Sequence, residues 1–184
     1  MLIQFSSLIG TLTRVSVCPY SGLYWGKRGR LGQVVESFGF RGTHPVRIEQ
    51  KGRISMPSRY REQLRTDSGP AMVCTPAPTG GCLFLYPLSK WTQIENDLMA
   101  LPSTPKNVDV QRLVLGQASD VQIDSKGRFL IPAHLREDAQ LKEGEEVLLI
   151  GMSYKFEVWN APLWNRNRVK IAENVDMTDF PIAL

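Results

Sequence analysis

The chain has 184 residues, of which 42% are hydrophobic and 22% are charged, a composition typical of a globular protein with a sizeable core. No stretch approaches the ~18 consecutive apolar residues of a membrane helix. Residues 1–13 lack the basic start of an export signal. The three cysteines have no Cys-x-x-Cys spacing, which fits a reducing compartment and supplies no metal framework. The net charge of +4 says little about partners by itself, because four basic residues and Glu36 place most of it within residues 1–38.

Residues 1–38 form an N-terminal extension without a sustained helical or strand period. The glycine-rich, basic run at 26–32 lacks the strand and helix on either side that a phosphate-binding loop requires. Two interpretations remain open for this segment. It is either a disordered, flexible arm or translated sequence that lies upstream of the native start.

From residue 43 onward the chain contains the same short sequence motif twice. Residues 46–62 and 121–137 share eight identical positions at a constant offset (121 − 46 = 75). An ungapped match of this kind indicates a duplicated structural unit. In the first copy, alternation predicts a strand at 46–49, a tight turn at 50–52, a return strand at 53–56 that makes a short hairpin, and a helix from Pro57 to Leu64. The second copy repeats this order, with its turn at 125–127, its return strand at 128–131 and its helix at 132–139.

Further elements follow each copy. Strands are expected near 72–73, 83–86, 146–151 and 156–159, and a helix-like stretch follows Trp164. Two helices are expected between the copies, at 90–101 and 108–116, the second with Val110, Leu113 and Val114 facing inward. Because a hairpin with one helical turn is marginally stable alone, we expect the two copies to interleave their strands in one pseudo-two-fold barrel.

The turns carry the residues that favour nucleic-acid binding. An arginine presents a planar fork that fits O6 and N7 of guanine, with about 1–3 kcal/mol of discrimination, and a lysine suits a phosphate. A narrow two-stranded ribbon can enter the major groove. The alternative is a hairpin that needs glycine for its turn and carries solvated charges. Retention of the same residues in both copies favours DNA binding by Lys51, Gly52, Arg53, Lys126, Gly127 and Arg128.

Charged neighbours add to this prediction. Glu49 and Asp124 each stand four residues before the arginine of their turn, where the acid either holds the guanidinium in one rotamer or forms an ordinary ion pair worth less than ~1 kcal/mol. Residues 41–65 hold seven basic residues and two acidic ones, so the first copy has the stronger attraction for a polyanion. Salt bridges between copies or between subunits are expected from the helix residues Arg61, Glu62, Arg136 and Glu137.

Enzymatic chemistry has few residues to support it. The chain holds only two histidines, His44 and His134, and the second occupies the position of Arg59 in the first copy. No cluster of histidine, cysteine and acidic residues has the spacing of a metal site. We therefore expect a protein that is not an enzyme and that uses no metal or cofactor.

Several motifs together resemble the MraZ family of bacterial transcriptional regulators. They are the tandem Asp/Glu-x-Lys-Gly-Arg-x-x-x-Pro units, Arg-Tyr-Arg-Glu at 59–62, Leu-Tyr-Pro-Leu-x-x-Trp at 85–91 and Lys-Phe-Glu-Val-Trp at 155–159. The resemblance covers about residues 40–184. It implies a mainly β fold with short helices (α+β), namely an AbrB-like double-split β-barrel with swapped hairpins and an internal tandem duplication. The implied parts are SpoVT-AbrB domains at 43–90 and 119–162, a helical connector at 91–118 and a C-terminal helix or tail at 163–184.

The resemblance also implies a function. It predicts a repressor of the division and cell-wall gene cluster, including its own operon, which binds repeated G-rich boxes in double-stranded DNA. It implies a ring-shaped homo-oligomer in the cytoplasm, associated with the nucleoid, with no membrane or small-molecule partner. The family's DNA-contacting pattern is Asp-x-x-x-Arg. Asp124 and Arg128 match this pattern, and Glu49 and Arg53 match it with one added methylene group.

Members of this family usually begin with Met-Phe-x-Gly, whereas Phe40 here follows Gly39. This difference supports the hypothesis that translation begins near Val34 or Val35. The intact mass of the protein from its own host tests it, because a mass that includes Met1 to Phe38 excludes the later start.

A second class of function stays open, namely an AbrB-like antitoxin or interaction module. The antidote of a toxin–antitoxin pair can share this type of barrel, but it normally carries an acidic toxin-binding tail, and the acidic end here, residues 173–184, is short. Co-purification of a small toxin would favour this class.

Overall fold

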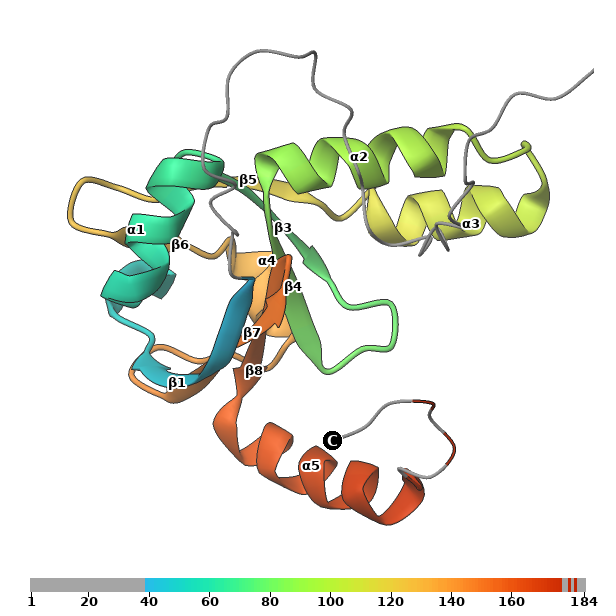
Figure 1. The fold of residues 1–184 in the computed structure, drawn as a ribbon. Helices are drawn as coiled ribbons and strands as arrows, with labels where there is room; N and C mark the ends of the chain where they lie inside the picture. Colours follow the sequence, from blue (N-terminus) through green and yellow to red (C-terminus); the bar gives the residue numbers. More distant parts are fainter. Residues whose placement is uncertain (1–38, 177–178, 180, 182–184) are drawn as a thin grey trace, which may run out of the picture. The chain divides into compact units, whose positions relative to one another are not determined.

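The computed structural model describes residues 39–176, 179 and 181, all within the compact unit Glu36–Leu184. The N-terminal extension predicted at 1–38 lies outside the described residues. The elements, shown in Figure 1, are β1 (Phe40–Arg47), the 3-10 helix η1 (Gln50–Gly52), β2 (Arg53–Ser55), α1 (Ser58–Asp67), β3 (Ala71–Pro76), β4 (Cys82–Pro87), α2 (Leu88–Met99), α3 (Pro105–Val114), β5 (Ser119–Gln122), β6 (Arg128–Leu130), α4 (Ala133–Asp138), β7 (Glu146–Ser153), β8 (Lys155–Asn160) and α5 (Ala161–Asn174).

The fold is a mixed α+β arrangement whose strands pair antiparallel. Six strands form one sheet in the order β1-β7-β8-β4-β3-β5, and β2 pairs with β6 in a separate two-stranded ribbon. Both copies contribute three strands to the large sheet, and the pairs β1–β7, β4–β8 and β3–β5 each join one strand from each copy. Within the described part of the chain, no pairing closes this sheet into a barrel between β1 and β5.

The return strands pair differently from the sequence-based prediction. The expected hairpin between residues 46–49 and 53–56 is wrong, because β1 pairs with β7 and β2 pairs with β6 of the other copy. Only the bridge between Glu49 and Arg53 joins the two arms of the first turn. The ribbon extends at both ends, since Met56 N donates to Gly127 O at 2.8 Å and Ile131 N donates to Gly52 O at 3.0 Å.

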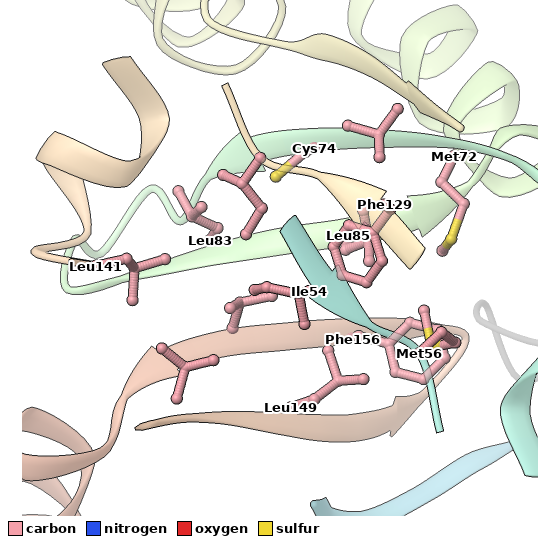
Figure 2. Close-up of a cluster of buried hydrophobic side chains, with 14 of the residues drawn as sticks. Ile54, Met56, Met72, Cys74, Leu83, Leu85, Phe129, Leu141, Leu149 and Phe156 are labelled. Carbon is pink, nitrogen blue, oxygen red and sulfur yellow. The ribbon is translucent and has the colours of Figure 1, made fainter. Parts of the chain in front are cut away.

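Burial of the ribbon's inner face explains this pairing. Ile54 of β2 and Phe129 of β6 are opposite each other and almost fully buried. Figure 2 shows both side chains in a cluster with Leu85 from β4, Leu149 from β7 and Phe156 from β8. Full burial of a large apolar side chain contributes about 1.5–3 kcal/mol. The core therefore fixes which faces of β2 and β6 point outward.

Proline directly precedes three of the helices, α1, α2 and α4. Pro57, Pro87 and Pro132 have φ near −54° and an extended ψ, and they stand directly before α1, α2 and α4. Proline suits this position because its fixed φ fits the helix start and its missing N–H has no intrahelical partner there. Among the described residues, no helix is long and apolar enough to cross a membrane.

The two helices between the copies, α2 and α3, lie side by side in Figure 1. Trp91 anchors α2, since it is buried against the sheet beside Tyr86. The predicted inward face of α3 is partly wrong, because Val110 and Leu113 are 37% and 57% exposed. This helix begins at Pro105 and contacts the sheet mainly near its end, where Thr75 Oγ1 donates to Val114 O at 2.9 Å.

Candidate nucleic-acid interface

The two Lys-Gly-Arg turns have the same backbone hydrogen bonds. In the first turn, Glu49 N donates to Arg53 O at 2.7 Å and Gly52 N donates to Glu49 O at 3.1 Å. The second turn repeats these bonds at 2.7 and 2.8 Å between the residues 75 positions later. Gly52 and Gly127 both have φ of +78°. The chain needs glycine at these positions because other residues are strained in the left-handed region.

Each turn packs against an arginine on the helix of the other copy. Arg61 of α1 covers Gly127, and Arg136 of α4 covers Gly52, so closely that a Cβ atom at either glycine would collide with the arginine. Arg61 Nη1 also donates to Lys126 O at 3.3 Å. These reciprocal contacts hold both turns at the ends of the β2–β6 ribbon.

The four charged helix residues behave only partly as predicted. Arg136 Nε donates to Ile131 O at 3.2 Å, and its Nη1 pairs with Glu143 of its own copy at 3.5 Å. Arg61 reaches the other copy through a carbonyl rather than a carboxylate. Within the described part of the chain, neither arginine forms a salt bridge between copies. Salt bridges between subunits stay a prediction for Arg61, Glu62, Arg136 and Glu137.

Asp124 organises the second turn. Its Oδ1 accepts from the backbone N–H groups of Lys126 and Arg128 at 2.9 and 2.8 Å, and its Oδ2 accepts from Arg128 Nε and Nη2 at 3.1 and 3.0 Å. The Arg128 backbone hydrogen bond is the main reason why the pKa of Asp124 lies below its usual value, and the Arg128 guanidinium adds to the effect. The predicted pairing of Asp124 with Arg128 is confirmed, with two hydrogen bonds from the guanidinium to one carboxylate oxygen.

Glu49 occupies in the first turn the position that Asp124 has in the second, but its side chain makes different contacts. It does not cap η1; instead Oε1 accepts from Ser55 Oγ at 3.1 Å and Oε2 lies 4.0 Å from Arg128 Nη1. Arg128 therefore lies near carboxylates from both copies. The Glu49–Arg53 side-chain pair that the sequence predicted is absent from the described residues, and in this turn Lys51 also adopts a positive φ of 65°.

The outward face of the ribbon is open and carries cations. Buried Ile54 and Phe129 alternate with outward-facing neighbours, and Lys51 and Lys126 are exposed at the two turns. Sequence reasoning identified the two arginines of this face but missed the other two residues, although period-two alternation places them beside the arginines. The outward-facing residues are Arg53, Ser55, Arg128 and Leu130.

A pocket of about 600 Å³ adjoins the second turn. It lies between α1 and the loop around Asp124, and charges of both signs line it, including Arg61, Glu62 and Arg65. The described residues contain no group of three or more histidine, cysteine or acidic side chains that could hold a metal ion. The charged side chains around this pocket can form ion pairs and hydrogen bonds.

The described residues therefore form an antiparallel α+β fold that presents two arginines and two lysines on a two-stranded ribbon. Comparison with known proteins identifies the family. The family model described as "MraZ protein, putative antitoxin-like" matches residues 40–112 and 114–179. The chain belongs to the MraZ family.

Curated relatives agree with this assignment. A protein of Escherichia coli O127:H6 named Transcriptional regulator MraZ is 45% identical over 138 residues, which are 74% of this chain and 88% of the relative. A protein of the same name from Pseudomonas putida strain F1 is 42% identical over 127 residues, 68% of this chain and 83% of the relative. A solution structure of a Pyrococcus horikoshii protein aligns at 12% identity with a TM-score of 0.31, over 64% of this chain and 95% of that one. The relatives support a role in transcriptional regulation.

Proposed function

We propose that this chain is a sequence-specific DNA-binding repressor whose β2–β6 ribbon enters the major groove. The supporting observation is that both turn arginines, each half-buried, lie on the one outward face of the ribbon, with exposed lysines beside them. The major groove is about 12 Å wide and admits a two-stranded β-ribbon. A surface of this kind serves duplex DNA better than a small ligand.

Each residue of the ribbon has a distinct role in this proposal. Arg53 and Arg128 donate to guanine O6 and N7, while Lys51 and Lys126 bind the phosphates on either side. Asp124 lowers the entropic cost of binding, because it already holds Arg128 in one rotamer. Supporting roles in placing the turns or joining subunits fall to Glu49, Gly52, Gly127, Arg61, Glu62, Arg136 and Glu137.

The proposal extends to assembly and targets. SpoVT-AbrB domains at 43–90 and 119–162 would form a double-split β-barrel with swapped hairpins, which fits a ribbon built from one strand of each copy. Ring-shaped homo-oligomers would place successive ribbons on repeated G-rich boxes, and avidity would then strengthen individually weak contacts. The proposed target is the division and cell-wall gene cluster, including the chain's own operon, and the proposed location is the cytoplasm in association with the nucleoid. Relatives named as transcriptional regulators support the regulatory part of this proposal.

Arginine substitutions test the proposal. A mobility-shift assay compares wild type, Arg53→Ala and Arg128→Ala on the upstream region of the chain's own operon, after footprinting has located the protected site. Both variants are expected to lose specific binding while keeping the wild-type thermal midpoint. Arg112→Ala is the matched control, because this arginine is exposed on α3 and, among the described residues, forms its ion pair with Asp109 at 2.8 Å. If both ribbon variants bind like wild type, the proposed reading surface is wrong.

Salt dependence provides a second measurement. Phosphate contacts release counterions, so the logarithm of the affinity should fall linearly with the logarithm of the salt concentration. Lys51→Ala and Lys126→Ala should each lower this slope by about 1 per engaged subunit without changing which sequence is protected. An unchanged slope in both variants would show that the two lysines do not contact the phosphates.

The description of the family as antitoxin-like supports a second candidate function. In that case the chain would neutralise a small toxin and repress their shared operon. Purification from the native host tests this candidate, because a bound small protein that arrests growth when expressed alone would establish it. Absence of such a partner, together with specific operator binding, leaves the repressor as the sole function.

A further inference from the structure

The outward face of the ribbon consists of two unlike cross-strand pairs. Arg53 is opposite Leu130, and Ser55 is opposite Arg128. Opposite residues share a face, with Cβ atoms about 4.5–5.5 Å apart. The ribbon therefore presents one arginine beside a serine and the other beside a leucine.

Both residues of the Ser55–Arg128 pair interact with carboxylate groups. Ser55 donates its hydroxyl hydrogen to Glu49, and Arg128 pairs with Asp124 at 3.0 Å and lies 4.0 Å from Glu49. The side chain of Arg128 is only 26% exposed. This half of the face is polar and its groups already have partners.

The Arg53–Leu130 pair has no such carboxylate contacts within the described residues. Among the described residues, the Arg53 side chain has no hydrogen-bond or ion-pair partner, and Leu130 is 50% exposed. Leu130 occupies the position that Ser55 has in the first copy (130 − 55 = 75), so the ribbon also accepts a small polar residue there. Single exposed leucines are common on protein surfaces, but this one stands directly across from a guanidinium that the proposed function places on a base.

We infer that Leu130 contacts the 5-methyl group of a thymine next to the base pair that Arg53 reads. This inference rests on the proposed function and adds a base to what the ribbon recognises. In the major groove, thymine is distinguished by its methyl group, which apolar side chains contact. Base pairs are spaced 3.4 Å apart along a strand, so a side chain about 5 Å from Arg53 reaches a neighbouring base pair rather than the same one.

Replacing thymine by deoxyuridine removes the 5-methyl group from the base, and the comparison of wild type with Leu130 variants then isolates the contribution of Leu130. Two duplexes of the footprinted operator are compared, one natural and one with every thymine replaced by deoxyuridine. Wild type is expected to bind the deoxyuridine duplex about fourfold more weakly for each engaged subunit, the effect of one buried methyl group. Leu130→Ala and Leu130→Ser should bind both duplexes equally, with about the affinity of wild type for the deoxyuridine duplex.

The control is Met152→Ala, which truncates a side chain of similar exposure, 46%, on β7 of the other sheet. This variant should keep the wild-type ratio between the duplexes, and thermal midpoints verify that all variants fold. The inference is overturned if Leu130→Ala keeps that ratio or if wild type binds both duplexes equally, and specific binding by the proposed ribbon stands in either case. Absence of specific binding by wild type would overturn the proposed function and the thymine contact with it.

Discussion

Replacing Gly127 by alanine tests whether the second turn depends on the helix of the first copy. Gly127 has φ of +78°, and an alanine in the left-handed region costs roughly 1–2 kcal/mol. The new methyl group would also displace Arg61, whose Nη1 donates to Lys126 O at 3.3 Å. Loss of that hydrogen bond adds about 0.5–1.5 kcal/mol. Gly127→Ala should therefore lower the free energy of unfolding by about 1.5–3.5 kcal/mol.

Urea unfolding at one fixed protein concentration measures this cost. Gly80→Ala is the control, because Gly80 has φ of +75° with nothing within 4 Å of a new Cβ atom, so only the backbone penalty applies. In an Arg61→Ala background the collision is absent, and Gly127→Ala should then cost no more than Gly80→Ala. If Gly127→Ala lowers the free energy of unfolding equally with and without Arg61, the proposed packing of the turn against α1 is wrong.

Two further predictions concern acidity and thiol reactivity. The pKa of Asp124 is held below its ordinary value of 3.8, mainly by the Arg128 backbone N–H, so its stabilising effect on the turn is full above that value and disappears as the pH falls through the lowered pKa. Asp124→Asn should accordingly speed amide hydrogen exchange at Arg128 near pH 6, and unchanged exchange would contradict this reading. Burial raises the pKa of both the Cys74 and Cys82 thiols to about 12. In a Cys18→Ser background, iodoacetamide at pH 8 should therefore modify the native protein much more slowly than an exposed thiol, because the thiolate is the reacting form. Rapid labelling without unfolding would show that the two thiols are accessible.

The sequence by itself determined the local structure of the ribbon. Gly52 and Gly127 marked both turns because only glycine adopts a positive φ without strain. Alternation of apolar and polar residues also placed Arg53 and Arg128 on the outward face, since successive strand residues point to opposite sides. The pairing of Asp124 with Arg128 was expected because both residues belong to one short turn. Glu49 and Arg53 were expected to pair on the same ground, but in the described residues Glu49 contacts Ser55 and lies near Arg128 instead.

Only the tertiary structure decided which strands pair and what surrounds each arginine. The sequence predicted that residues 53–56 return along their own copy, whereas β2 pairs with β6 and buries Ile54 against Phe129. The same exchange brings Glu49 towards Arg128 and leaves Arg53 beside Leu130. A turn depends on the residues within it, but strand pairing depends on burying apolar area against residues some 75 positions away, which no local pattern specifies.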